Sequence, residues 1–196
     1  MLIGREHGHL GQSLYQLIET GTSEGAPPPV DLTDELKAGN LVRALIREGK
    51  VTAVHDVSDG GLLVAIAEMA LAGCESLGTR ALGHGAPEGQ AKSGGGPDAL
   101  SASEGQIKGF GVEVYPYEGR LPAHAIWFGE DQGRYVLAAH PSTAEEVAER
   151  ARLLGLPARI VGRVTGTALS LKGETQMPLA ELRAAHEAWL PGFMGE

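Results

Sequence analysis

An apolar segment at residues 62–72, in which Glu68 is the one charged residue, most constrains how this chain folds. Its leucine, alanine and methionine residues favour a helix, and Gly73 stands where a C-terminal cap would be. We therefore expect a helix from about Gly61 to Ala72. Because a helix that is apolar nearly all round cannot face water, this one must be buried in its own domain or against a partner.

The residues before this helix predict a strand and a turn. Residues 51–54 are typical of a buried strand, and residues 55–61 (HDVSDGG) connect it to the helix. At such a junction the N–H groups of Gly60, Gly61 and Leu62 can face an anion, since the first turn of a helix has no internal partners for them. The two glycines also lack Cβ atoms, which permits close approach by a phosphate group.

The carboxylates of this turn restrict which ligand fits. Asp56 and Asp59 would repel a bare phosphate unless they engage Mg²⁺ or hydroxyl groups, so a magnesium nucleotide or a sugar fits better. The candidate phosphate- or nucleotide-binding residues are Asp56, Ser58, Asp59, Gly60 and Gly61. The alternative is a purely structural turn, in which Asp59 caps the helix, Ser58 satisfies a backbone donor and the glycines only allow close packing.

A second polar group lies at residues 124–135 (HAIWFGEDQGRY). Its acid pair, Glu130 and Asp131, stands beside histidine and glutamine, and these residue types coordinate metals or act as acid and base. The structural alternative is that the acids form a turn, the two aromatic residues belong to the core and Arg134 pairs with a carboxylate. The sequence assigns no metal ligand and no catalytic residue.

Predicted helices and strands alternate along the rest of the chain. Helices are expected at residues 10–18, from an Asp31 or Thr33 cap to Gly49, from a Ser142 or Thr143 cap to Leu154, and at residues 179–189. Strands are expected at residues 111–115, 134–139, 158–164 and 168–171. This order predicts an α/β or α+β fold in which helices pack on a mixed sheet.

We expect one domain over residues 1–196. Its first 30 residues hold a helix and a proline-rich loop, and residues 83–106, rich in glycine and serine, form a flexible loop. His7 and His9 lie near a terminus that we expect to fray.

Composition excludes several classes of protein. The chain has 16 Lys and Arg against 25 Asp and Glu, a net charge of −9, so it offers no general attraction to nucleic acid. No apolar run is long enough to span a membrane, and the N-terminus lacks the pattern of a signal peptide. We therefore expect a cytoplasmic protein that binds neither nucleic acid nor membranes.

Four stretches, in order, resemble the C-terminal region of the phosphoribosylformylglycinamidine synthase family, in the small bacterial form of its synthetase subunit. They are residues 9–15 (HLGQSLY), 25–32 (GAPPPVDL), 55–70 (HDVSDGGLLVAIAEMA) and 128–135 (FGEDQGRY). The resemblance spans residues 2–175 or so. It implies a domain of the aminoimidazole ribonucleotide synthetase C-terminal type.

The resemblance also implies a reaction and partners. Members of the family use ATP and Mg²⁺ to convert formylglycinamide ribonucleotide and glutamine-derived ammonia into the amidine, a step of purine biosynthesis. Their partners are a glutaminase subunit and a small accessory subunit. In the family, the catalytic histidine and the main ligands of ATP and magnesium lie in preceding N-terminal domains that have no counterpart here, so no catalytic residue is carried over.

The sequence therefore favours a ligase domain that is inactive alone and that depends on those missing N-terminal domains. Two alternatives stay open. One is a freestanding or regulatory module that binds a phosphorylated metabolite through the turn at residues 56–61. The other is a structural domain that docks its neighbours.

Overall fold

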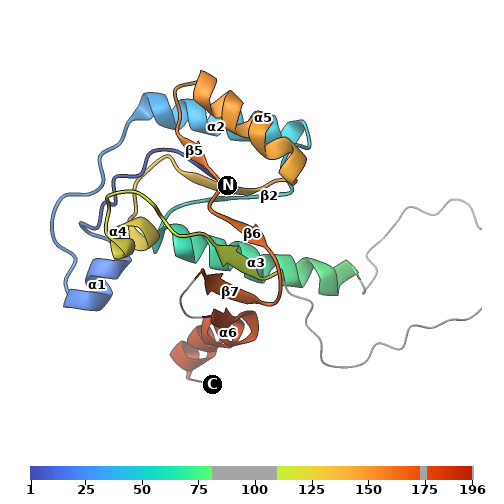
Figure 1. Cartoon of the computed structure of the whole chain (residues 1–196). Coiled ribbons are helices and arrows are strands. Elements are labelled where there is room, and N and C mark those ends of the chain that lie inside the picture. The colour runs from blue at the N-terminus through green and yellow to red at the C-terminus, as the bar shows by residue number, and fades with distance from the viewer. Residues whose placement is uncertain (81–109, 173–175, 196) are drawn as a thin grey trace, which may run out of the picture.

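The computed structural model describes residues 1–80, 110–172 and 176–195, which form helices and two four-stranded sheets (Figure 1). The helices are α1 (Leu14–Thr20), α2 (Leu32–Arg47), α3 (Gly61–Arg80), α4 (Ala123–Phe128), α5 (Pro141–Leu153) and α6 (Leu179–Met194). The strands are β1 (Leu2–Ile3), β2 (Ala53–Asp56), β3 (Val112–Val114), β4 (Tyr135–Ala138), β5 (Ala158–Arg159), β6 (Gly162–Val164), β7 (Ala168–Leu171) and β8 (Gln176–Pro178). This combination confirms the predicted α+β class.

The first sheet has the strand order β2-β4-β1-β5 and is antiparallel throughout. The second has the order β6-β3-β7-β8 and is mixed, because β3 and β7 run parallel. In the first sheet Leu2 pairs with both Val136 and Arg159, so β1 lies between two other strands. The expectation of a frayed N-terminus is therefore wrong, since Leu2 and Ile3 are 1% and 0% exposed.

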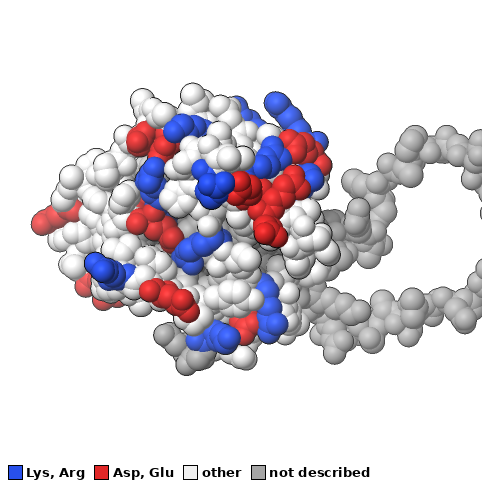
Figure 2. All heavy atoms as spheres, turned by 45° about the horizontal axis from the view of Figure 1, so that its top comes forward, with Lys and Arg blue, Asp and Glu red and all other residues white. Residues whose placement is uncertain are grey.

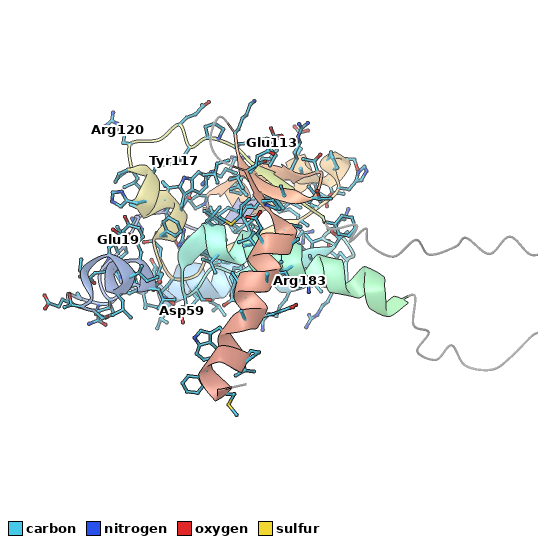
Figure 3. The ribbon with its side chains drawn as sticks, turned by 90° about the horizontal axis from the view of Figure 1, so that it is seen from below. Glu19, Asp59, Glu113, Tyr117, Arg120 and Arg183 are labelled. Atoms are coloured by element: carbon cyan, nitrogen blue, oxygen red, sulfur yellow. The ribbon has the colours of Figure 1, made fainter. Side chains whose placement is uncertain are left out.

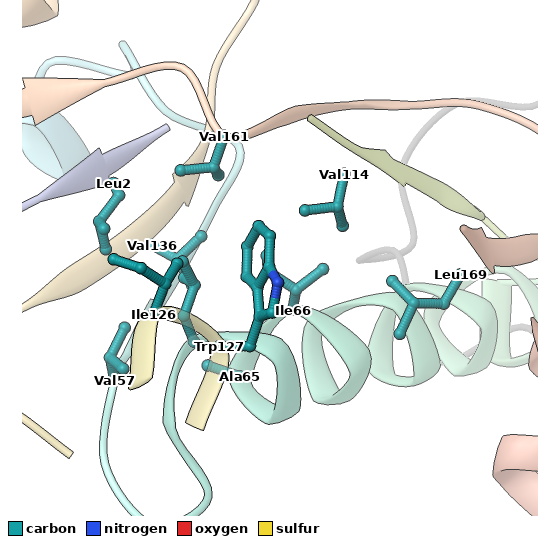
Figure 4. Close-up of a cluster of buried hydrophobic side chains, with 11 residues drawn as sticks. Leu2, Val57, Ala65, Ile66, Val114, Ile126, Trp127, Val136, Val161 and Leu169 are labelled. Atoms are coloured by element: carbon teal, nitrogen blue, oxygen red, sulfur yellow. The ribbon is translucent and has the colours of Figure 1, made fainter. Parts of the chain in front are cut away.

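Successive residues of β1 point to opposite faces of the sheet and so divide the core in two. Ile3 packs with Leu137 and with buried side chains of α2 and α5. Leu2 packs in a second cluster around α3 that includes Ile66 and Trp127 (Figure 4). Strands β3 and β7 contribute to that same cluster, so α3 is buried against both sheets, which explains its apolar sequence.

Helix α3 is longer than the sequence predicts. It continues through Gly73 to Arg80, and Gly73 is not among the glycines with a left-handed backbone. A Cβ atom on Gly73 would lie 3.2 Å from Cδ2 of Phe110. The glycine therefore permits close packing inside the helix, and the prediction that it ends the helix was wrong, because Gly73 continues the helix and does not adopt the left-handed backbone of a glycine cap.

Two strand predictions need correction. Residues 158–164 form two strands in different sheets, β5 and β6, and the chain crosses between the sheets at Ile160 and the buried Val161. Strand β2 begins at Ala53 rather than at residue 51, and it lies at a sheet edge, where its side chains are half-buried or exposed. A short segment with a strand-like composition shows neither a crossing between sheets nor a place at a sheet edge.

Helix ends were predicted with mixed success. Asp31 caps α2, as expected, by accepting hydrogen bonds from the backbone N–H groups of Thr33 and Asp34. Helix α5 instead begins at Pro141 and is capped by His140, two positions before the first expected cap, and Nδ1 of His140 accepts from the N–H of Ser142. Helix α6 runs to Met194, beyond the predicted end at residue 189. The predicted flexible loop at residues 83–106 lies outside the described part of the chain.

Charged side chains of both signs are interspersed on the face that carries α2 and α5 (Figure 2). Lys50 pairs with Glu146 at 2.8 Å, and Arg150 pairs with Glu48 at 2.5 Å. The hydrogen bond from Arg150 lowers the pKa of the Glu48 carboxyl below its usual value. Within the described ranges, no helix has the length and apolar character needed to cross a membrane.

Candidate functional site

The turn between β2 and α3 depends on two glycines with left-handed backbones. Gly60 has φ +78° and Gly61 has φ +76°, a region that residues with a Cβ atom rarely adopt. A Cβ atom on Gly61 would lie 2.7 Å from the carbonyl carbon of Phe128 and 2.8 Å from the oxygen of Gly129. The glycine at this position therefore lets the start of α3 approach the backbone at the end of α4.

The N–H groups of both glycines are already hydrogen-bonded within the protein. The N–H of Gly60 donates to Oε1 of Glu130 at 2.8 Å, and the N–H of Gly61 donates to the carbonyl oxygen of Ser58 at 3.0 Å. The same Oε1 atom accepts from the N–H of Leu14, the first residue of α1, at 2.9 Å. Glu130 thus places a carboxylate where the sequence suggested that a bound anion would lie.

The three polar side chains of the turn face outward. Asp56, Ser58 and Asp59 are exposed. No hydrogen bond to any described residue holds the Asp59 carboxylate, so the predicted capping by Asp59 does not occur. These three side chains remain able to accept hydrogen bonds from the hydroxyl groups of a ligand, so their role as ligand contacts stays a prediction.

His55 fixes the end of β2 against α3. Its Nε2 atom lies 3.1 Å from Oε2 of Glu68, on α3, and its Nδ1 atom lies 2.6 Å from the carbonyl oxygen of Asp56. The histidine ring therefore joins the strand, the turn and the helix. The side chain of Asp56, the next residue, is 69% exposed.

Asp131, the second acid of the pair in residues 124–135, is buried and holds the N-terminal segment. Its Oδ2 atom accepts from the N–H groups of His7 (3.0 Å) and Gly8 (2.9 Å), and its Oδ1 atom accepts from the N–H of His9 (3.1 Å). The adjacent N–H of Glu130 donates to the carbonyl oxygen of His9 at 2.9 Å. The backbone of residues 7–9 is therefore held by the Asp131 carboxylate and by the backbone N–H of Glu130.

Arg134 lies beneath this arrangement and is 2% exposed. Its guanidinium donates to the carbonyl oxygens of Asp131 (3.1 Å) and Gly129 (2.5 Å), and Nη1 lies 3.8 Å from Oδ2 of Asp131. Burial lowers the pKa of Arg134 below its ordinary value, whereas the carboxylates of Asp131 and Glu6 oppose that shift. The geometry agrees with the predicted pairing of Arg134 with a carboxylate.

The acid pair is therefore used for structure. Both carboxylates accept backbone hydrogen bonds, and Trp127 is buried in the core as the structural alternative requires. Across residues 1–80, 110–172 and 176–195, no group of three or more His, Cys, Asp or Glu side chains is placed to hold a metal ion. What sequence reasoning missed was the contact of Glu130 with Gly60, because the two residues meet only through the fold.

The chain belongs to the family described as AIR synthase related protein, C-terminal domain, whose model matches residues 1–77 and 101–173. Among its relatives, phosphoribosylformylglycinamidine synthase subunit PurL of Methylocella silvestris is 42% identical over 194 residues, which are 99% of this chain and 22% of that protein. The protein of the same name from Rhodopseudomonas palustris is 43% identical over 195 residues, 100% of this chain and 22% of that protein. This chain thus spans about 22% of the length of these relatives.

Solved structures share the fold. The chain in "T. maritima PurL complexed with FGAR" matches with a TM-score of 0.61 and 17% identity, over 92% of this chain and 27% of that one. The chain in "T. maritima PurL complexed with ATP" matches with a TM-score of 0.56, over 92% and 24%. At this identity the likeness shows a common fold.

We expect Gly61→Ala to destabilise the domain far more than Gly155→Ala. Both glycines have a left-handed backbone, but a Cβ atom on Gly155 meets nothing within 4 Å, whereas one on Gly61 meets backbone atoms at 2.7 Å. Gly155→Ala should lower the free energy of unfolding by about 1 kcal/mol, and Gly61→Ala by at least about 3 kcal/mol. Urea denaturation measures both, and equal losses would contradict the contact with α4.

We expect Asp131→Ala to lower the free energy of unfolding by about 3–5 kcal/mol, because it leaves three backbone N–H groups without their acceptor and the buried Arg134 without its counter-ion. Asp131→Asn keeps one acceptor oxygen and should fall between the wild type and the alanine variant. The control is Asp34→Ala, which removes an ion pair with the half-exposed Arg5 and should cost much less. If the two alanine variants were equally stable, the buried network would not support the fold.

Proposed function

We propose that this chain is the C-terminal domain of a phosphoribosylformylglycinamidine synthase subunit, and that it acts as part of that ATP-dependent ligase in purine biosynthesis. The observation that supports this most is the match to PurL proteins over 99–100% of this chain at about 40% identity. Because the chain spans 22% of those proteins, it corresponds to one part of a larger enzyme.

In this proposal the domain frames a cleft and does not carry out the chemistry. The acids best placed to act as acid and base, Glu130 and Asp131, already accept backbone hydrogen bonds. Formation of the amidine from formylglycinamide ribonucleotide, ATP and glutamine-derived ammonia therefore requires residues of the preceding domains. The glutaminase and small accessory subunits are the further partners that the family implies, and the cytoplasm is the expected location.

The turn at residues 56–61 would contact substrate through its exposed side chains. Since the N–H groups of Gly60 and Gly61 already have acceptors, a phosphate would have to displace Glu130 before it could bind there. Hydroxyl groups of a ribose can instead donate directly to Asp56 and Asp59. In this proposal ATP and Mg²⁺ are held mainly by the other domains, as the family resemblance implies.

The isolated chain should show no amidine formation above background with formylglycinamide ribonucleotide, ATP, Mg²⁺ and ammonia. The matched protein is a chimera, in which this chain replaces the corresponding 194 residues of the M. silvestris subunit, and it should be active. An assay of ADP release and of product by chromatography compares the two. Turnover by the isolated chain would contradict its dependence on other domains, and an inactive, folded chimera would contradict the assignment to this enzyme.

Within the chimera, Asp59→Asn should raise KM for the ribonucleotide about tenfold, the effect of losing roughly 1.4 kcal/mol of binding, with kcat little changed. The control is Asp34→Asn, because Asp34 pairs with Arg5 and not with a residue of the turn, and this change should leave both constants unchanged. An unchanged KM in Asp59→Asn would favour the structural docking alternative. Calorimetry on the isolated chain addresses the binding-module alternative, since ribonucleotide binding tighter than about 10 μM would favour it.

A further inference from the structure

Helix α6 has one mainly apolar face, and this face extends beyond the part of the helix that packs on the domain. Its residues recur at intervals of three and four, which places them on a single face of the helix. They are Leu179, Leu182, His186, Trp189 and Phe193. At the start of the helix this face is covered, because Leu179 is 3% exposed and Leu182 packs against the core around α3.

The second half of α6 has no such cover. Every residue from 184 to 195 is exposed, and Figure 3 shows this half of the helix extending away from the sheets. Its exposed apolar side chains are Trp189 (67%), Leu190 (57%), Phe193 (73%) and Met194 (68%). The rings of Trp189 and Phe193 stack at 5.3 Å. We call these four residues the α6 tip.

Such a cluster on a projecting helix is unusual for a surface that faces only water. Large apolar patches of this kind mark interaction sites, and a helical segment without tertiary contacts gains little stability from its own hydrogen bonds. The first half of α6 is anchored, since Nη2 of Arg183 donates to the carbonyl oxygen of Leu71 on α3 at 2.9 Å. The first half of α6 is therefore fixed on the domain, and the α6 tip projects from it.

The comparisons indicate where the partner of the α6 tip lies. The family model ends at residue 173, before α6, whereas the PurL relatives match 194–195 residues of this chain and therefore include α6. The helix is thus shared with the longer synthase proteins and lies outside the general domain. Those relatives also have most of their length beyond the part matched here.

We infer that the α6 tip docks into an apolar groove on the portion of a synthase chain that this chain does not span. The inference rests on the proposed function. Attachment within one polypeptide makes a small contact sufficient, since the effective concentration of linked domains reaches the millimolar range. Four side chains on each side fall short of the roughly 1,200–2,000 Å² that stable interfaces between separate chains bury, which argues against a second copy as the occupant.

Hydroxyl-radical oxidation, read by mass spectrometry at single residues, tests this inference on the isolated chain and on the chimera with the M. silvestris subunit. Trp189 and Met194 should be oxidised at least about fivefold more slowly in the chimera, because a docked surface excludes water. Trp127, 8% exposed, is the internal control and should be protected in both proteins. In the chimera, Phe193→Glu should restore fast oxidation of Trp189, whereas Leu153→Glu, at a 70% exposed position on α5, should not.

Equal oxidation rates in the two proteins would overturn the inference. So would protection of the isolated chain that increases with its concentration, which would indicate a second copy, or protection that appears only when the glutaminase subunit is added. Activity of the chimera separates this test from that of the function. An active chimera with an unprotected α6 tip contradicts the docking alone, and a protected α6 tip in an inactive chimera supports the docking and contradicts the proposed reaction.

Discussion

The buried carboxylate of Asp131 is the interaction on which the rest of the domain depends. It accepts three consecutive backbone N–H groups, those of His7, Gly8 and His9, and it lies against the buried guanidinium of Arg134. This contact fixes the N-terminal segment shortly after β1, which is one of the two interior strands of the first sheet. Because Asp131 follows Glu130 directly, the same contact places the Glu130 carboxylate at the start of α3.

The consequence for function concerns the start of α3. The glycine turn has the sequence of an anion site, yet Glu130 supplies the anion from within the protein. Its bonds to Gly60, the residue before α3, and to Leu14, the first residue of α1, join the starts of two helices through one oxygen atom. The domain therefore presents a rigid turn whose outward-facing groups are carboxylates and a serine hydroxyl. Our proposal assigns these outward-facing groups to the edge of a ligand site, with phosphate chemistry carried out by the neighbouring domains.

Much of the fold could be predicted from the sequence where the signal is local. The periodicity of α2, its Asp31 cap and the alternation in β3 are properties of short segments, and they were predicted. Strand β1 could not be found, because two residues show no period and their partners lie more than a hundred positions away. The crossing between β5 and β6 was missed for a related reason, since a segment with a strand-like composition looks the same in the sequence whether or not it changes sheets.

The candidate site divides in the same way. The turn and its five candidate residues followed from a strand, two glycines and an apolar helix adjacent in the sequence. The role of Glu130 and Asp131 as acceptors of backbone N–H groups could not be predicted. Acids before a strand have the same sequence pattern whether they bind a metal, catalyse a reaction or accept backbone hydrogen bonds. Arg134 gave part of the signal for this structural role, because a charged residue at the start of a strand that enters the core needs a carboxylate partner.

Hydrogen exchange of backbone amides tests the role of Asp131 most directly. The account predicts that the amides of His7, Gly8 and His9 exchange slowly and together, in step with the amide of Gly60, because one buried cluster protects all four. Exchange as fast as that of exposed Ser23 would contradict it.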